Sequence, residues 1–184
     1  MNAIKVLLCL LTISSTSLTS SAQGGLNVLK VGGNLLQILS DNESETYGGG
    51  GLSLEHTLKK KSSLCINLDF NTKKVEASDG FNTIEDRVSI TTIEPEFRFY
   101  TQEPLNGFYI GFAPAVHILK DKVSGTISGN DSETRFGLGA KAGYQFAISK
   151  VRLQFGGGVG GFFPKEGEHF TGRYNLNLLL GFNL

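Results

Sequence analysis

The strongest constraint on the fold is an alternation of side chains over residues 170–184. Successive residues of a β-strand point to opposite faces, so a period of two is compatible with a strand and not with a helix. One register is apolar and consists of Phe170, Gly172, Tyr174, Leu176, Leu178, Leu180, Phe182 and Leu184. The positions between are mostly polar, as in Arg173, Asn175 and Asn177. We predict a strand here with one apolar and one polar face.

Seven further segments alternate in the same way, namely 26–38, 47–58, 63–71, 88–100, 108–119, 135–146 and 151–163, of which 26–38 is the weakest. The connections alternate in length: 40–46, 72–86 and 120–134 are long, 164–169 is intermediate, and 59–62, 101–106 and 149–150 are short. Short turns at one end and longer polar loops at the other are typical of outer-membrane barrels. We therefore expect one all-β domain over residues 23–184, an eight-stranded antiparallel up-and-down transmembrane β-barrel.

Residues 1–22 have the pattern of a secretory signal peptide. Lys5 precedes the apolar run Val6–Ile13, and Ser20-Ser21-Ala22 supplies small residues for cleavage after Ala22. The run is much shorter than the ~20 residues that span a bilayer as a helix. We expect export and cleavage, with the mature chain in the outer membrane of a Gram-negative cell. Cys65 is then the remaining cysteine, so no internal disulfide is expected.

Charge and hydropathy narrow the class of protein. The chain has 17 basic and 17 acidic residues, which gives no overall attraction to nucleic acid. The mean hydropathy of −0.03 resembles that of a soluble protein. In a barrel, however, each lipid-facing residue alternates with a polar inward residue, so the average cancels while the pattern persists.

The apolar register could face lipid or the interior of a soluble ligand-binding barrel. Its aromatic residues favour lipid, because they gather at both ends of the strands and would form two girdles at the membrane interfaces. The predicted girdle residues are Phe70, Phe97, Phe99, Phe108, Phe136, Tyr144, Phe146, Phe163, Phe170 and Phe182. The soluble periplasmic barrel remains the alternative.

The polar register combines acids and bases with many glycines, as expected for a narrow lumen filled by side chains. The predicted lumen charge network is Glu55, Asp69, Glu94, Glu96, Arg98, Arg135, Lys141, Arg152 and Arg173. Charges enclosed in so narrow a space must be paired or hydrogen-bonded. We expect a salt-bridged plug that closes the lumen, with a narrow ion path or gate as the alternative.

The signal peptide, the eight alternating segments and the C-terminal pattern resemble the small OmpA/OmpX-type outer-membrane barrels. The segment Ile93-Glu-Pro-Glu-Phe-Arg-Phe-Tyr100, followed by Gly107-Phe-Tyr-Ile-Gly-Phe112, is similar to a hairpin of small Bacteroidetes barrel proteins of unassigned role. The resemblance implies a C-terminal signal for the barrel-assembly machinery, here Leu180, Phe182 and Leu184. Such barrels commonly end on an aromatic residue, and this chain departs from that pattern with Leu184.

Other motifs carry little chemistry. Gly156–Gly161 fits G-x-G-x-x-G, but it runs into Phe162-Phe163-Pro164 and not into a helix, so small lumen residues are the better interpretation than a phosphate loop. His117 is expected in the lumen, His169 in an outer loop and His56 near a short turn. A hydroxyl and a carboxylate for catalysis would have to converge on His117 or His169, and candidates such as Ser124, Ser128, Glu166 and Glu168 are present only because those loops are polar. Asp41, Glu43, Glu45 and Asp79 could attract Ca²⁺ or bridge lipopolysaccharide weakly.

The expected function is non-enzymatic: a structural or surface-binding role through the outer loops, above all 120–134. No catalytic residue, metal site or cofactor is predicted. The expected partners are outer-membrane lipid and lipopolysaccharide, the assembly machinery and an unknown external ligand, and the chain is expected to be a monomer. The alternatives are a small pore, a lipid-A-modifying enzyme and the soluble ligand barrel.

Overall fold

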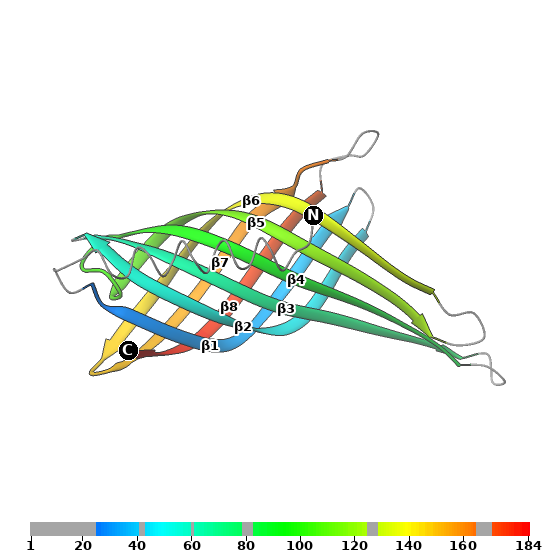
Figure 1. Cartoon of the computed structure of the whole chain (residues 1–184), viewed down its shortest axis with the longest axis horizontal. Coiled ribbons are helices and arrows are strands. Elements are labelled where there is room, and N and C mark those ends of the chain that lie inside the picture. The colour runs from blue at the N-terminus through cyan, green and yellow to red at the C-terminus, as the bar shows by residue number, and fades with distance from the viewer. Residues whose placement is uncertain (1–24, 41–42, 60, 79–82, 125–128, 165–170) are drawn as a thin grey trace.

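The computed structural model describes residues 25–184 except 41–42, 60, 79–82, 125–128 and 165–170. The strands are β1 (Asn27–Ser40), β2 (Glu43–Lys59), β3 (Ser62–Ser78), β4 (Thr83–Tyr100), β5 (Gly107–Ser124), β6 (Gly129–Ile148), β7 (Val151–Phe162) and β8 (Thr171–Asn183). Each strand pairs antiparallel with the next, and β8 pairs with β1 to close the barrel (Figure 1). The predicted fold class is confirmed. No helix in this described part is long and apolar enough to cross a membrane.

The two ends of the barrel differ. One end, here called the turn end, carries the connections 60–61, 101–106 and 149–150. The other end, the hairpin end, carries the connections between β1 and β2, β3 and β4, β5 and β6, and β7 and β8. At the hairpin end, β3, β4, β5 and β6 extend beyond the other strands as a protruding sheet (Figure 1).

The long loops expected at the hairpin end are largely strand, so that prediction is wrong. The expected loop 120–134 is occupied by β5 up to Ser124 and by β6 from Gly129, and the expected loop 72–86 by β3 up to Ser78 and β4 from Thr83. The expected loop 40–46 is reduced in the same way, since β1 ends at Ser40 and β2 begins at Glu43. The ladder continues through these residues. Both faces of a protruding strand meet water, so hydrophobic alternation, the signal used for prediction, is absent there.

The apolar register forms the outer wall. Phe70, Phe99, Phe136, Phe163 and Phe182 are all about half exposed, as a surface that contacts lipid requires. The other described girdle residues, Phe97, Phe108, Tyr144 and Phe146, are likewise on the outer wall, whereas Phe170 lies outside the described residues. Neighbouring rings touch on this wall, with 4.9 Å between the centroids of Phe97 and Phe99.

The interior is polar through the middle of the barrel and apolar toward the hairpin end. There Leu36, Tyr47 and Ile90 form a buried cluster, with Ile38, Val88 and Leu119 packed against it. The sequence analysis did not predict this cluster. Its members are apolar residues on the inward register, which is otherwise polar, so they weaken the alternation on which the prediction depends. The cluster leaves the hairpin side of the lumen filled with hydrocarbon side chains.

Candidate functional site: a closed lumen network and a protruding sheet

Glu55 on β2 is the centre of the first part of the lumen network, and its side chain is fully buried. It forms salt bridges with Lys30 of β1 and with Arg98 of β4, the latter with 3.1 Å between Nη1 and Oε2. Ser63 Oγ and Tyr100 Oη donate hydrogen bonds to Oε1, from Tyr100 at 2.5 Å. A carboxylate with two cations and two hydroxyl donors is stable in such a site, whereas an unpaired one would not be.

Lys30 was not among the predicted network residues. It is fully buried, and besides Glu55 its Nζ donates to Gln145 Oε1 at 2.9 Å and to Gln154 Oε1 at 2.6 Å. The missed signal was its place between Leu29 and Val31, where a lone charge in an apolar stretch occupies the inward register. The weak alternation over residues 26–38 hid that register.

Arg98 joins the first part of the network to the second. Its guanidinium makes a bidentate pair with Glu96, with Nε–Oε1 and Nη2–Oε2 both at 2.7 Å. Nη1 also donates to Gln154 Oε1 at 2.8 Å, and the guanidinium carbon lies 4.5 Å from the ring centroid of Tyr109. The planar fork of arginine suits this combination of a bidentate carboxylate and an aromatic face.

Glu94 is the centre of the second part. Lys141 of β6 and Arg173 of β8 both pair with it, Arg173 Nη2 at 2.6 Å from Oε2. Lys141 also lies 3.9 Å from Glu96 Oε2, and Asn67 Nδ2 donates to the same oxygen at 2.9 Å. Asp69, half-buried and hydrogen-bonded to Asn34, borders this part of the network.

Two predicted members lie outside the buried network. Arg135 pairs with Glu133 at 3.1 Å on the inward register of β6, toward the hairpin end. Arg152 donates through Nη1 to the carbonyl oxygens of Ser149, at 2.8 Å, and Val151, at 3.1 Å, at the β6–β7 turn. Both side chains are on the inward register, as predicted. Their position along the barrel axis, which a single sequence does not reveal, determines which groups they pair with.

Side chains from all eight strands meet in this network: Lys30, Glu55, Asn67, Arg98, Tyr109, Lys141, Gln154 and Arg173 come from β1 to β8 in that order. Acids and bases neutralise one another within it. The arrangement can cross-link the barrel wall and close the lumen.

Glycines make room for Tyr109, which is fully buried. A Cβ added at Gly156 would lie 2.5 Å from Tyr109 Oη, and one at Gly143 would lie 2.6 Å from it. Gly156 belongs to the G-x-G-x-x-G match, which the structure places within strand β7 and not before a helix. These glycines therefore accommodate a side chain of β5 that lies over β6 and β7.

The histidines differ in their surroundings. His117 is fully buried, its Nδ1 is 2.9 Å from Thr92 Oγ1, and its ring contacts Phe162 edge-to-face with centroids 4.6 Å apart. His56 Nδ1 is 2.7 Å from Asn27 Oδ1 at the turn end. His169, Ser128, Glu166 and Glu168 lie outside the described residues, as do Asp41 and Asp79, and the side chains of Ser124 and Glu43 are not described. Among the described residues, no three His, Cys, Asp or Glu side chains are grouped to hold a metal ion.

The protruding sheet has an acidic inward face. Asp121 of β5 is directly opposite Asp131 of β6, and Asp86 of β4 lies beside them. Desolvation by its neighbours, a hydrogen bond with Asp86 and the negative charges of Asp86 and Asp131 raise the pKa of Asp121. Glu45 instead pairs with Lys73 at 2.7 Å and accepts a hydrogen bond from Tyr47 Oη at 2.5 Å, so it is not a free carboxylate for a cation.

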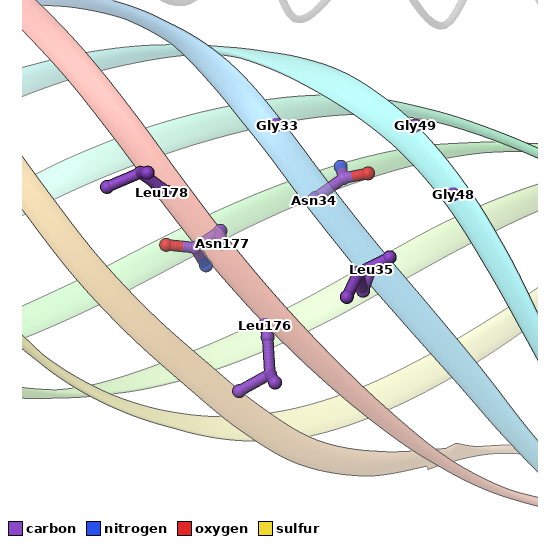
Figure 2. Close-up of a pocket in the computed structure, with 8 residues that line it drawn as sticks. All are labelled: Gly33, Asn34, Leu35, Gly48, Gly49, Leu176, Asn177 and Leu178. Atoms are coloured by element: carbon purple, nitrogen blue, oxygen red, sulfur yellow. The ribbon is translucent and has the colours of Figure 1, made fainter.

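The outer wall has a shallow hollow of about 470 Å³ where β8, β1 and β2 run side by side. Gly33, Gly48 and Gly49 contribute no side chain there, and Leu35, Leu176 and Leu178 border it (Figure 2). Leu35, Leu176 and Leu178 are about half exposed. The hollow is therefore part of the apolar wall.

The geometry defines the class of protein: a small, closed, eight-stranded barrel with an apolar outer wall, as found in outer membranes. The chain belongs to the family described as "Protein of unknown function (DUF3575)", whose model matches residues 8–175. No curated protein sequence matches it.

Solved structures share the fold. The attachment invasion locus protein (Ail) of Yersinia pestis, in complex with the heparin analogue sucrose octasulfate, is 12% identical with a TM-score of 0.66 over 88% of this chain and 100% of that chain. Neisserial surface protein A (NspA) is 13% identical with a TM-score of 0.58 over 87% of this chain and 99% of that one. At this level of identity the likeness concerns the fold, and it agrees with the resemblance inferred from the sequence.

Proposed function

We propose that this protein is a non-enzymatic outer-membrane barrel whose lumen is a structural plug and whose protruding sheet binds a ligand outside the cell. The observation that carries the proposal is the extension of β3, β4, β5 and β6 beyond the barrel (Figure 1). A rigid sheet that stands clear of the wall offers a binding surface at low entropic cost, because its strands are already ordered.

The apolar character of the outer wall supports a membrane location. Large apolar side chains such as Phe112, Phe136 and Leu176 are more than half exposed, an arrangement that water would penalise and lipid favours. The soluble ligand barrel requires the opposite arrangement. In the usual orientation of such barrels, the turn end faces the periplasm and the hairpin end faces outward.

The lumen supports a structural role in preference to a pore. Lys30 and Arg98 both pair with Glu55 in its middle, and the apolar cluster around Ile90 fills the hairpin side. The sulfated ligand of Ail is a precedent, in a protein of the same fold, for a small barrel that binds an external molecule.

The location and orientation are tested together by labelling intact cells. A short epitope inserted between Ser124 and Gly129 is expected to react with an antibody on intact cells, and the same epitope between Ser149 and Lys150 only after the outer membrane is opened. The protein is also expected in the outer-membrane fraction, with different electrophoretic mobility before and after boiling. Recovery as a soluble periplasmic protein would refute the proposal.

The alternative of a lipid-A-modifying enzyme is tested by the mass spectrum of lipid A. Deletion and overexpression strains are expected to have the same lipid A masses. A mass change that depends on this gene product would show that the barrel is a lipid-A-modifying enzyme.

A further inference from the structure

The outward face of the protruding sheet carries a group of basic side chains, here called the basic band: Lys74, Arg87, Lys120 and Lys122. In the register, Lys74 of β3 is opposite Arg87 of β4, and Arg87 is opposite Lys122 of β5. Lys120 is opposite Ser89, one outward position nearer the barrel. Residues that are directly opposite in an antiparallel pair share a face, so four cations from three strands form one surface.

Three aspartates at the hairpin end lie on the face of the sheet opposite the basic band. The basic band is on the outward face, whereas Asp86, Asp121 and Asp131 are on the inward one. The inward acids therefore do not neutralise the outward bases by direct contact.

Part of the basic band is neutralised by an acid on the same face. Glu85 pairs with both Lys74 and Arg87, each at 3.0 Å. Lys120 and Lys122 are exposed on β5, and Lys122 is directly opposite the like charge of Arg87. Glu76 occupies the register position opposite Glu85, one row further from the barrel. Two cations directly opposite one another, such as Arg87 and Lys122, repel and destabilise a sheet. An anion bound between them would remove this repulsion.

The position of the basic band relative to the apolar wall indicates which kind of anion it could bind. Lys74 is four residues beyond Phe70, the last exposed aromatic residue on β3. At ~3.3 Å per residue and a strand tilt of ~45°, this places Lys74 roughly 9 Å above Phe70. Lys120 similarly is two residues beyond Ile118 on the wall. The basic band thus stands at the level of the lipid headgroups and is continuous with the apolar wall below it.

We propose that the basic band binds the phosphorylated sugar headgroup of the outer leaflet glycolipid, as in lipid A, while the acyl chains of that lipid lie against the wall. A ligand with both an anionic head and apolar chains matches both adjacent surfaces, which a soluble sulfated polysaccharide does not. The inference rests on the proposed location and orientation. Cations near an anionic surface each contribute about fivefold to affinity.

The test is binding of lipid A to the purified full barrel in neutral detergent, measured by native mass spectrometry. Lys120→Gln/Lys122→Gln is compared with the control Lys61→Gln/Lys150→Gln, which removes the same charge at the turn end. The expected loss is about 25-fold in lipid A affinity for the first pair and less than twofold for the control. Lipid A without phosphates should bind the wild-type barrel as weakly as intact lipid A binds the first variant.

Equal binding of phosphorylated and dephosphorylated lipid A would overturn the inference. So would an equal loss in the two variants, or heparin binding through Lys120 and Lys122 when lipid A does not bind. The mobility shift on boiling and the epitope labelling report separately on the barrel and its orientation. If those hold while lipid A binding fails, only the lipid inference falls.

Discussion

At the residue scale, a charged side chain buried in the lumen depends on several neighbours to compensate its charge. Lys30 lies in an apolar stretch of sequence, yet its ammonium group is fully buried and bonds to Glu55, Gln145 and Gln154. A buried ion pair is weak evidence for net stability, but breaking it is costly, because the remaining charge has lost its partner and is shielded from water.

Lys30→Met is therefore expected to lower the free energy of unfolding by about 3 kcal/mol. The measurement is urea unfolding of the barrel in lipid vesicles. Lys150→Met, at an exposed turn position, is the control and should change stability by less than about 0.5 kcal/mol. Equal effects of the two changes would show that Lys30 is not part of a buried network.

The contact between Tyr109 and Gly156 gives a second residue-scale prediction. Gly156→Ala is expected to destabilise the barrel by about 1–3 kcal/mol, since its Cβ would lie 2.5 Å from Tyr109 Oη. Tyr109→Phe removes that oxygen, so the double variant should lose less than the sum of the two single changes. Gly48→Ala, with no atom within 4 Å of the added Cβ, is the control. Strict additivity in the double-mutant cycle would refute this account of Gly156.

At the scale of elements, strand length was the main error of sequence-based prediction. The walls of the barrel alternate, and their strands were found, but β3 to β6 continue past the alternating segments into a sheet with two polar faces. Lys73 and Lys74, for example, are adjacent charged residues of β3 whose side chains face opposite sides of the sheet. Such strands are held by hydrogen bonds between neighbouring backbones. Because these bonds do not depend on side-chain hydrophobicity, a hydrophobic pattern does not predict them.

The acidic inward face of this sheet should respond to pH. The pKa of Asp121 is raised in the folded sheet, so the folded form binds more protons than the unfolded form and stability falls as the pH rises through that pKa. At neutral pH Asp121→Asn removes repulsion, and about twofold slower hydrogen exchange is expected in β5 and β6. The difference from the wild type should shrink on acidification toward the ordinary Asp pKa of ~3.9.

Ser132→Ala, on the outward face of the same hairpin, serves as the control and should leave exchange unchanged at both pH values. Faster exchange in Asp121→Asn at neutral pH would mean that the carboxylate stabilises the hairpin, which contradicts mutual repulsion of the three aspartates.

At the scale of the whole molecule, the filled lumen determines what the barrel can transport. The charged network occupies the middle, the apolar cluster around Leu36 and Tyr47 occupies the hairpin side, and every strand contributes a side chain to the network. The protein is expected to be electrically silent in planar bilayers, because an ion would have to displace paired charges from a space already filled.

Single-channel recording checks this expectation. The reconstituted barrel should give no current steps, with its folding confirmed by the mobility shift on boiling. Stepwise conductance of the wild-type protein that Lys30→Met alters would instead identify the lumen as an ion path.

The sequence by itself determined the strand class, the number of strands and, where the alternation is strong, the face that a side chain takes, because period-two alternation survives in one dimension. It also predicted that Glu55, Glu94, Glu96, Arg98, Lys141 and Arg173 point inward. Only the tertiary structure decided which inward charges meet, brought in Lys30, placed Arg135 and Arg152 elsewhere, and extended β3 to β6 into a protruding sheet. The physical reason is that pairing depends on the stagger between strands and on closure of β8 against β1, which are relations between distant segments that no local pattern contains.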